Sequence, residues 1–559
     1  MREQSRTAFL YLLVLKKDGK IIVQYSLCED RIRIIREHNM IKRVLTVFLS
    51  VTMVLSVILF VVSCNNSTTE TTGTPSSETV VTTKETEKET VETKETTTVT
   101  TENDTTETTA EPNGREKMEG FEDVDFGGLT FLICATATDI FKPWRDDYTI
   151  WVEDVTGNAV DDAVYERNQV MKNLYNCEIM VDASGSSAYE ASIASGDQKY
   201  IARTSAYAVL SIASDKYYNV MKFDIDYTQP WWDQNFFEDL TCDGKVFTMC
   251  GAFNLVPKKA VWITYYNKDV YESKFSEVNI YQMVRDYEWT FDAMIDFIEK
   301  IRFDANGDSN YTFTDGADAD IIGYMSTAHN PRYLYYAGGH QFASKNENTY
   351  DGYFVSTLSD PKAIDTLEAA ARLVKTEGYL TEGYTNCDKA IMNGTTLFVS
   401  NVLGQLETYE SAEDLRIGIL PMPMVTADQH HYYHLPDNHS TFLSVPVAYE
   451  NMEVIAQFLT LFAYHSYKIV YPAFLNTYKY TYASDEDSGE MVDIIINNVS
   501  YDPGYLGALV TQFDSYISTM VNDSSKIGNF TSAATRFTAS LDQQIANYRD
   551  KISKIDDNY

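Results

Sequence analysis

The sequence predicts an α/β fold. The apolar run from Phe126 to Cys134 is typical of a strand that is covered on both faces. Apolar residues between Val160 and Leu174 then recur at helical spacing, and Glu178 to Val181 forms a second short apolar strand. A strand, a helix and a strand in this order indicate a parallel unit in which the helix is the crossover.

Local signals place further elements along the chain. Asp360-Pro361 is typical of a helix start, and the helix is expected over Lys362 to Lys375. Amphipathic spacing predicts two more helices, from Met452 to Tyr467 and from Ala533 to Ile552. Asp243-Gly244 indicates a two-residue hairpin turn.

The cysteines are expected to be buried free thiols. Of seven, Cys28 and Cys64 precede the folded part, and the other five show no C-x-x-C spacing, so neither a disulfide framework nor a zinc site is indicated. The hairpin turn would set Cys242 opposite Lys245. Cys250 then lies about 17 Å further along the return strand at ~3.3 Å per residue, too far to form a bridge.

Length and charge restrict the class of protein. A chain of 559 residues exceeds what one hydrophobic core usually serves, so two or more domains or lobes are expected. Apolar residues make up 44% and charged residues 23%, which are ordinary globular values. With 81 acidic and 45 basic residues, the net charge is −36. The electric field of this negative charge repels the phosphate backbone of nucleic acids. Nucleic acid is therefore not an expected partner.

A targeting signal lies near the N-terminus. The basic start Met40 to Arg43 leads into the 19 uncharged residues Val44 to Val62, which could be a signal peptide or a single membrane-spanning helix. The junction Val61-Val62-Ser63-Cys64 resembles a bacterial lipobox. That resemblance implies a lipoprotein signal peptide over 40–63 and an acylated Cys64, for instance with palmitate, anchoring the protein at the outer face of the cell membrane. Residues 1–39 are either untranslated, with a start at Met40, or a cytoplasmic extension.

A tether is predicted over 64–114. Between Asn65 and Glu111, 20 of 47 residues are Thr, 11 are acidic and none is aromatic. Such a segment cannot bury a core, so we expect it to be disordered and to hold the folded part away from the membrane.

Several short motifs follow one another along the chain. They are Gly244 to Phe247, Phe253 to Lys259, Val261 to Asp269, Trp289 to Asp292, Ala337 to Gly339, Asn393 to Phe398 and Gly418 to Pro423. In this order they resemble the hairpin, cleft loop, Y-N-K-D strand, W-T-x-D helix start and later motifs of the extracellular solute-binding proteins of bacterial carbohydrate importers, the group that includes maltose-binding protein.

The resemblance implies two α/β lobes joined by hinge strands, with the ligand held in the cleft between them. By position in the family, the first lobe comprises 115–256 and 400–447, and the second comprises 257–399 and 448–559. The hinge crossings then fall near Pro257, Ser400 and Ala448. A ligand that binds the closed state more tightly than the open state would shift the protein toward the closed state.

The implied function is that of a surface-anchored binding lipoprotein. It would capture a solute, which in this family is expected to be an oligosaccharide, and deliver it to the permease subunits of an ABC importer, as a monomer without a cofactor. No G-x-S-x-G, H-E-x-x-H or phosphate-binding glycine loop is present, so catalysis is not indicated. The alternatives are a cell-surface glycoside hydrolase and a carbohydrate-binding adhesin, and the identity of the solute is open.

The candidate ligand residues combine aromatic rings with planar polar groups. Trp231-Trp232-Asp233 lies just before the hairpin, and one of the two rings is expected to stack on a sugar, unless both pack in the core. The family's positions suggest further contacts, which are Asn254, Lys259, His329, Arg332, Asn401, Tyr501 and Tyr505. Trp289 is assigned to packing.

Two patterns resemble metal sites. Asp304, Asn306, Asp308 and Asp315 resemble a calcium loop, but Ser309 replaces the usual Gly, and a solvated acidic turn is the alternative. Four histidines between His430 and His439 have ligand chemistry for zinc, but no regular element presents them together, so we expect a surface loop.

Overall fold

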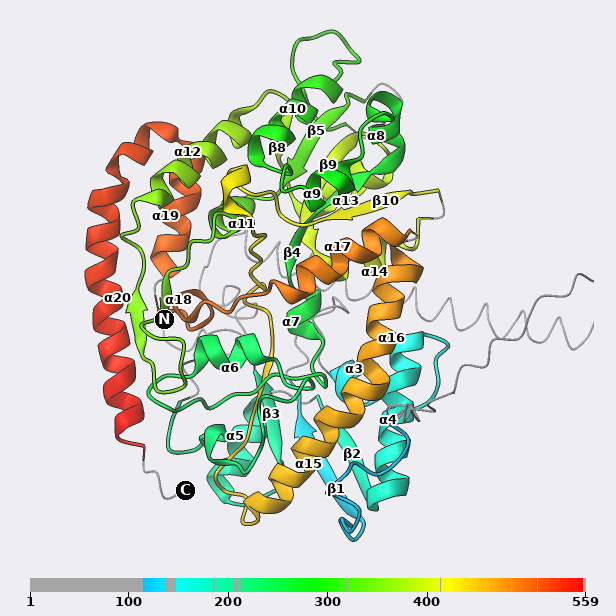
Figure 1. Ribbon diagram of the computed structural model, residues 1–559, viewed down its shortest axis with the longest axis vertical. Helices are drawn as coiled ribbons and strands as arrows, with labels where there is room; N and C mark the ends of the chain where they lie inside the picture. Colours follow the sequence, from blue (N-terminus) through cyan, green and yellow to red (C-terminus); the bar gives the residue numbers. More distant parts are fainter. Residues whose placement is uncertain are drawn as a thin grey trace, which may run out of the picture. The chain divides into compact units, whose positions relative to one another are not determined.

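A computed structural model describes residues 114–135, 147–183, 186–205, 210, 213–314, 316, 319–412, 414–483, 485–509 and 511–555 (Figure 1). The predicted signal peptide, Cys64 and nearly all of the predicted tether lie outside these residues. Everything described belongs to one compact unit, 107–559. In this part of the chain, no helix has both the length and the apolar character that a membrane span requires.

The first sheet has the strand order β11-β3-β1-β2. Its strands are β1 (Leu129–Cys134), β2 (Cys177–Asp182), β3 (Ala202–Ser205) and β11 (Phe442–Ser444). β1 pairs in parallel with β2 and with β3, whereas β11 runs antiparallel to β3. The helix α4 (Ala159–Tyr175) precedes β2, so the predicted strand, helix and parallel strand are confirmed.

Local capping and core packing explain α4 and its neighbours. The Asn158 side chain accepts hydrogen bonds from the first backbone N–H groups of α4, and Asn176 ends the helix in the left-handed conformation, with φ of 51°. The helix α15 (Met452–His465) covers the same sheet, because Phe458 stacks on Phe131 of β1 with ring centroids 3.9 Å apart. This core belongs to the first lobe.

The second sheet has the strand order β10-β4-β9-β5-β8. Its strands are β4 (Trp262–Asn267), β5 (Ile322–Ser326), β8 (Tyr379–Thr381), β9 (Thr396–Val402) and β10 (Ile417–Leu420). β5 is parallel to β8 and β9, and β4 is antiparallel to β9 and β10. Every residue of β4, β5 and β9 is buried, as expected for strands that are covered on both faces.

Helices around the second sheet begin where the sequence signals them. Asn267, the last residue of β4, caps α8, and Thr290 caps α10. Trp289 is fully buried and donates to the Pro421 carbonyl at 2.9 Å, so its assignment to packing is confirmed. The helices of this lobe are α8 (Lys268–Phe275), α9 (Ile280–Arg285), α10 (Phe291–Ile301), α11 (Asn330–Ala337), α12 (Lys362–Lys375), α13 (Tyr384–Met392) and α17 (Glu486–Asn497).

The remaining described elements include the long C-terminal helix and several short helices, turns and strands. They are the strands β6 (Ala343–Lys345) and β7 (Phe354–Ser356), the helices α3 (Asp147–Ile150), α5 (Ser186–Ser195), α6 (Gln234–Leu240), α7 (Val256–Lys259), α14 (Leu406–Tyr409), α16 (Tyr471–Asn476), α18 (Pro503–Leu506), α19 (Thr511–Asn522) and α20 (Phe530–Ser553), the π-helical turns η6 (Ser466–Val470) and η7 (Thr477–Tyr482), and the 3-10 turns η3 (Val220–Lys222), η4 (Leu403–Gln405), η5 (Ala427–Gln429) and η8 (Ser524–Asn529).

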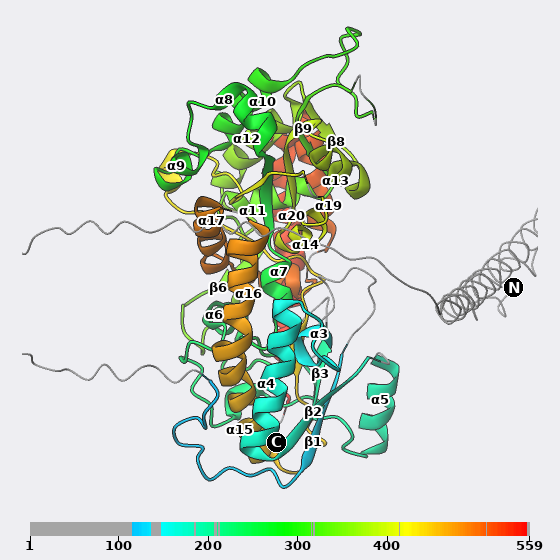
Figure 2. The same ribbon diagram turned by 90° about the vertical axis from the view of Figure 1, so that its right-hand side faces the viewer.

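The chain crosses between the sheets at several places. α7 leads from the first lobe into β4 of the second sheet, close to the predicted crossing at Pro257. Residues 434–441 lead back to β11, with Pro436 bridged to Val261. The third crossing is helical: α15, η6, α16 and η7 follow one another without interruption and form one rod that ends near α17 (Figure 2).

Two of the predicted lobe boundaries are wrong. The segment 400–447 was assigned to the first lobe, but β10 within it pairs with β4 of the second sheet. The segment 448–559 was assigned to the second lobe, but α15 within it packs on β1 of the first sheet. The physical reason is that strand pairing and helix packing join residues far apart in sequence, whereas the boundaries were placed by position along the chain.

The hairpin at Asp243-Gly244 is confirmed. Both turn residues have positive φ, 48° and 70°, as a two-residue turn of this type requires. The backbones of Cys242 and Lys245 form an antiparallel β-bridge across the turn. Arg549 of α20 pairs with the Asp243 carboxylate at 2.7 Å, so the long C-terminal helix ends against this turn. The described cysteines, Cys134, Cys177, Cys242, Cys250 and Cys387, are all buried thiols outside any disulfide, as predicted.

Two buried histidines link folding stability to pH. Burial lowers the pKa of His434 to about 3 and the pKa of His465 to about 4. Because the unfolded chain takes up these protons near pH 6.5 and the folded chain does not, each histidine contributes stability at neutral pH that is lost as the pH falls. Burial raises the pKa of Asp239 to about 7 and of Asp388 to about 6, and these groups act in the opposite sense.

We therefore predict a differential effect for His434→Gln. Between pH 7 and pH 5, the variant should lose about 2 kcal/mol less unfolding free energy than the wild type, because one proton-linked group is removed. Urea denaturation at the two pH values measures this difference. Asn438→Gln provides the control, since it changes a residue of the same loop without removing a titratable group and should leave the pH dependence unchanged. Equal pH dependence in all three proteins would contradict the prediction.

Candidate functional site

The carboxyl ends of parallel strands mark the first candidate region. β5, β8 and β9 end at Ser326, Thr381 and Val402, on the same edge of the second sheet. Trp262, the first residue of the antiparallel β4, pairs with Val402 and so lies at this edge as well. Ligands of open α/β sheets bind outside the carboxyl ends of the strands, so this edge is where a ligand is expected.

Four rings gather at this edge, and we call Trp262, His329, Tyr333 and Tyr384 the edge cluster. Trp262 and Tyr333 are stacked, with centroids 4.1 Å apart and an interplanar angle of 12°, and both are 1% exposed. Tyr384 packs against Trp262 at 6.5 Å and is 44% exposed. His329, also exposed, lies parallel to Tyr384 at 6.2 Å. A buried stacked pair thus supports an outer pair that solvent reaches.

Polar groups lie behind the rings. The Tyr333 hydroxyl donates to Asp437 at 2.7 Å, and His439 contacts the other carboxylate oxygen at 2.5 Å. Burial alone would raise the pKa of Asp437, but the hydrogen bonds from His439 and Tyr333 outweigh it and lower the pKa. Asp437 lies on the crossing segment 434–441, so the edge cluster is tied to the connection between the lobes.

Arg332 and Tyr505, both predicted ligand residues, contact each other beside the edge cluster. Arg332 follows His329 in α11 and forms a paired ion contact with Asp514 of α19, in which Nη2 and Oδ2 are 2.6 Å apart. Its guanidinium also donates to the Tyr505 hydroxyl and lies over that ring, 4.8 Å from the centroid. Arg332 is 8% exposed. These contacts fasten α11 to α18 and α19.

The first sheet offers a hollow at its own carboxyl edge. Its lining comes from the carboxyl end of β2, at Val181 and Ala183, and from the segment that follows α3, with a cavity volume of about 820 Å³. The half-buried Trp151 lies on that segment, beside Glu153 and other acidic and apolar residues, and Tyr148 of α3 lines the same hollow. Sequence reasoning missed this group, although Trp151-Val-Glu-Asp154 combines a ring with two acids, the same combination that drew attention to Trp231.

Four predicted residues, Trp231, Trp232, Asp233 and Asn254, line a separate cavity of about 220 Å³, which we call the hinge cavity. Its walls come from the loops before α6 and α7, from α7, from the helical crossing and from the end of α17. The full lining is Pro230, Trp231, Trp232, Asp233, Gln234, Asn235, Gly251, Ala252, Asn254, Leu255, Lys258, Tyr467, Tyr471, Ile496 and Asn497. No residue of the edge cluster is among them.

Both tryptophan rings are buried. Trp231 is 8% exposed and packs edge-on against Tyr464 of α15 at 5.2 Å. Trp232 is 3% exposed and packs against Phe237 and Phe253. The sequence allowed two predictions for this pair: one ring stacks on a sugar, or both rings pack in the core. These contacts favour the second.

Asp233 joins three segments beside the hinge cavity. Its Oδ1 accepts the Phe236 N–H and caps α6, while its Oδ2 accepts Lys258 Nζ at 2.8 Å and the Tyr501 hydroxyl at 2.6 Å. Burial would lower the pKa of Lys258, but the charge of Asp233 outweighs this and raises it. Tyr501, predicted as a ligand contact, is fully buried and serves this carboxylate.

Lys259 of α7 and Asn401 of β9 are held in buried polar contacts. Lys259 pairs with Glu407 at 2.7 Å, and Tyr478 donates to the same carboxylate at 2.8 Å. Asn401 donates to Asp388 at 3.3 Å. Both predicted ligand residues therefore have protein partners in this structure.

The predicted surface loop of histidines is only partly correct. His430 and His431 are exposed, but His434 is 1% exposed and its Nε2 accepts the Met422 N–H at 3.4 Å. His434 is buried because its segment pairs with Val499. Among the described residues, no three His, Cys, Asp or Glu side chains are placed to hold a metal ion.

The calcium-like loop is described in part. Asp304 accepts the backbone N–H groups of Gly307 at 2.7 Å and Ser309 at 2.8 Å, and Asn306 accepts that of Asp308 at 2.8 Å. These bonds form a compact turn. Asp315 lies outside the described residues, so the fourth oxygen of the pattern is not placed.

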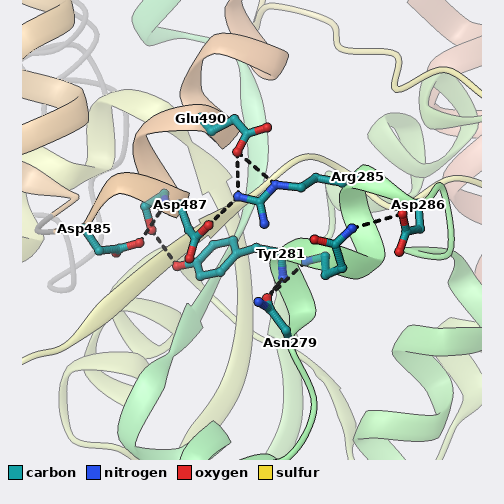
Figure 3. Close-up of polar contacts among 9 residues, drawn as sticks. Asn279, Tyr281, Arg285, Asp286, Asp485, Asp487 and Glu490 are labelled. Atoms are coloured by element: carbon teal, nitrogen blue, oxygen red, sulfur yellow. Dashed lines mark hydrogen bonds and ion pairs between the residues drawn. The ribbon is translucent and has the colours of Figure 1, made fainter.

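α17 is fastened to α9 on the second lobe (Figure 3). Arg285 of α9 donates to Glu490 at 2.9 Å, and Tyr281 lies 2.6 Å from the Ser488 hydroxyl. Asn279 caps α9, and Lys268 of α8 pairs with Asp485 at the start of α17. These contacts hold the far end of the helical crossing against the second sheet.

Comparison with known proteins gives structural likenesses only. No family profile and no curated protein sequence matches the chain. Solved structures that it is similar to include a cyclo/maltodextrin-binding protein complexed with maltotetraose, with 12% identity, a TM-score of 0.48, and 76% of this chain and 98% of that chain covered. The cyclic α-maltosyl-1,6-maltose binding protein from Arthrobacter globiformis has 12% identity, 76% and 99% coverage and the same TM-score of 0.48.

A third structure, UspC of M. tuberculosis, has 13% identity, a TM-score of 0.48, and 74% of this chain and 100% of that chain covered. Because these likenesses are low, the two-lobed α/β architecture is described from the strand pairings of this chain itself.

The two tryptophans of the hinge cavity are predicted to be stability residues. Trp231→Ala and Trp232→Ala should each lower the unfolding free energy by about 3–5 kcal/mol, because each removes a buried ring from a packed site. Chemical denaturation measures the loss. Trp151→Ala is the matched control and should cost clearly less, since Trp151 is only half-buried. A variant of Trp231 or Trp232 as stable as the wild type would contradict the assignment.

Proposed function

We propose that this protein is a lipid-anchored solute-binding protein that captures a carbohydrate and passes it to an ABC importer. Three observations support the proposal: the two α/β lobes with several crossings between them, the ordered motifs of the sequence, and the edge cluster at the carboxyl ends of the second sheet. We place the ligand at this edge and not in the hinge cavity.

The edge cluster is the observation that carries the proposal. A sugar presents flat C–H faces and a rim of hydroxyl groups, so it is recognised by aromatic rings together with planar polar side chains. Tyr384 offers a ring that is 44% exposed and is supported from below by Trp262. His329 and the Asp437–His439 pair supply polar groups beside it. Aromatic walls with a few placed polar groups are the usual composition of small-molecule sites.

The charges near the site favour a neutral ligand. Arg332 is committed to Asp514, and Asp437 is committed to Tyr333 and His439. An anionic or cationic solute would have to break one of these buried pairs, which is costly. A neutral oligosaccharide needs no such exchange, so it is the solute class that we propose, with binding and no turnover.

The anchor and the importer are proposed from the sequence. The lipobox at Val61 to Cys64 supports acylation of Cys64, and the Thr-rich segment after it supports a tether to the membrane. The motifs shared in order with carbohydrate-importer binding proteins support delivery to permease subunits. Calcium bound by Asp304, Asn306, Asp308 and Asp315 stays a prediction.

The ring of Tyr384 should be required for binding. Tyr384→Ala should weaken binding of the best oligosaccharide by about 1–3 kcal/mol, or roughly 5- to 150-fold in Kd, without changing the melting temperature of the free protein by much. A thermal-shift screen of residues 115–559 against maltooligosaccharides, xylooligosaccharides and galactosides identifies the ligand, and calorimetry measures Kd. Tyr480→Ala removes a ring that is 59% exposed elsewhere and should leave Kd unchanged. Equal Kd for both variants would exclude the edge cluster as the site.

The anchor is tested separately. Cys64→Ser should abolish incorporation of labelled palmitate and release the protein from the membrane fraction, because acylation needs the thiol. Cys28→Ser, which removes the other cysteine that precedes the folded part, should keep the label. Unchanged lipid labelling in Cys64→Ser would contradict acylation at Cys64.

A further inference from the structure

We infer that the turn Asp243-Gly244-Lys245 is a non-covalent pivot between the lobes, held by α20 and by the hairpin β6–β7. We call this contact the flank pivot. The inference goes beyond the proposed function, because it concerns the motion of the lobes and not the ligand. The flank pivot confines that motion to rotation about one axis, which runs from the helical crossing to the turn.

The turn is part of the first lobe. The Val246 carbonyl, directly after the turn, accepts the Val220 N–H at 2.9 Å. Further along the chain, the Met249 N–H donates to the Leu443 carbonyl of β11 at 2.8 Å. Because β11 is an edge strand of the first sheet, the turn moves with this sheet.

α20 begins on the second lobe. Phe537 in its first half packs against Phe513 and Tyr516 of α19, with ring centroids 5.2 and 5.6 Å apart. α19 is fastened to α11 of the second lobe by the ion contact of Asp514 with Arg332. At 1.5 Å per residue, the 24 residues of α20 span about 36 Å. Figure 1 shows this helix reaching past α6 of the first lobe.

The hairpin β6–β7 moves with α20. Its base is bonded to Asp502, which accepts the Phe342 N–H at 2.6 Å and the hydroxyl of Tyr336 in α11. Phe354 of β7 stacks on Tyr548 of α20, with centroids 5.8 Å apart and an interplanar angle of 21°. α20 and the hairpin therefore form one block with the second lobe.

This block holds the turn by its side chain and by its backbone. Arg549 of α20 binds both carboxylate oxygens of Asp243, at 2.7 and 3.0 Å. The N–H groups of Asp243 and Gly244 donate to the carbonyls of Gly352 and Tyr350 in the β6–β7 loop, at 3.0 and 2.8 Å. Both N–H groups of the turn are thus used for contacts with the other lobe.

The third residue of the turn is bonded to the end of α20. Lys245 Nζ donates to the carbonyls of Ile552 and Ile555, at 3.1 and 3.2 Å. Carbonyls at the C-terminal end of a helix carry partial negative charge, so an ammonium group is favoured there. A Cβ at Gly244 would lie 3.5 Å from Asp351 Oδ1, so the loop packs closely on a turn residue without a side chain.

The flank pivot lies opposite the helical crossing. Figure 1 shows α20 along one side of the folded part and the rod of α15 and α16 along the other, with α7 between them. Figure 2, viewed from the side of the rod, has α20 behind it. Two bodies that are joined at one flank and in the middle can still twist against each other. A contact fixed on the far flank leaves rotation about the line through the contacts, and this rotation separates or approaches the two carboxyl edges.

The ion pair of the flank pivot can be removed without touching the core. Arg549 and Asp243 are 40% and 34% exposed, and an ion pair that solvent reaches contributes little to folding stability. Hydrogen bonds weaken steeply when their partners separate, so the contact tolerates a small rotation at the turn but not a displacement. Its loss should therefore affect the relative motion of the lobes more than their stability.

The test variant is Asp243→Asn combined with Arg549→Gln. Asn accepts positive φ, so the turn keeps its shape while the charges are removed. Spin labels on noncanonical residues at the exposed positions Val155 and Thr385, one at each carboxyl edge, report the inter-lobe distance by pulsed electron paramagnetic resonance. The full chain is measured in detergent without ligand. The width of the distance distribution should increase roughly twofold, because twisted arrangements become populated.

The matched control is Asp550→Asn combined with Lys554→Gln. It removes an exposed ion pair within α20 itself and should leave the width unchanged. Arg549→Lys keeps the charge but loses the two-point contact, so it should give an intermediate width, and it covers the case in which the double variant does not fold. Equal widths in the wild type and both pivot variants would overturn the inference, and so would equal broadening in the control. Since no ligand is present, the result is independent of carbohydrate binding.

Discussion

The Asp233 carboxylate is the contact on which the connection between the two lobes depends. It caps α6, pairs with Lys258 of α7 and accepts the Tyr501 hydroxyl from the segment that follows α17. A buried charge is tolerated only when it is paired and hydrogen-bonded, so the three segments are held where these bonds can form. Since α7 runs directly into β4, the position of Lys258 also determines where Trp262 enters the second sheet, and with it the edge cluster.

Aromatic side chains serve two different purposes in this protein. Trp231 and Trp232 are almost fully buried and join the core around α15, so their large area contributes to folding. Tyr384 is exposed, yet it has a buried stacked pair beneath it, so its ring is positioned without being covered. A ring that is suited to bind a ligand is exposed and is held in place by buried rings beneath it. The presence of a tryptophan in the sequence does not by itself distinguish such a surface from a core contact.

Elements with local signals could be predicted, whereas arrangements that depend on distant partners could not. The turn at Asp243-Gly244 needs two residues that accept positive φ, and the start of α12 needs only its own first residues, since Asp360 accepts the Lys362 N–H at 2.9 Å. β10, in contrast, belongs to the second sheet only because it pairs with β4, and His434 is buried only because its segment meets Val499. Neither partner is marked in the neighbouring sequence, and so the lobe boundaries and the histidine loop were misjudged.

The same distinction applies to the candidate site. Trp231 to Asp233 stood out as a group because the residues are adjacent in sequence, and they do line a cavity together. Tyr384 follows β8, and nothing near it marks a site, whereas His329, which follows β5, was predicted only from its position in the family. They meet because β8 lies beside β5 in parallel, which brings both carboxyl ends to one edge, next to Trp262 at the start of β4. The site is a product of sheet order, and sheet order is set by pairings between strands that lie far apart in the chain. Rings near the ends of parallel strands therefore have to be judged together, once the neighbours of each strand are known.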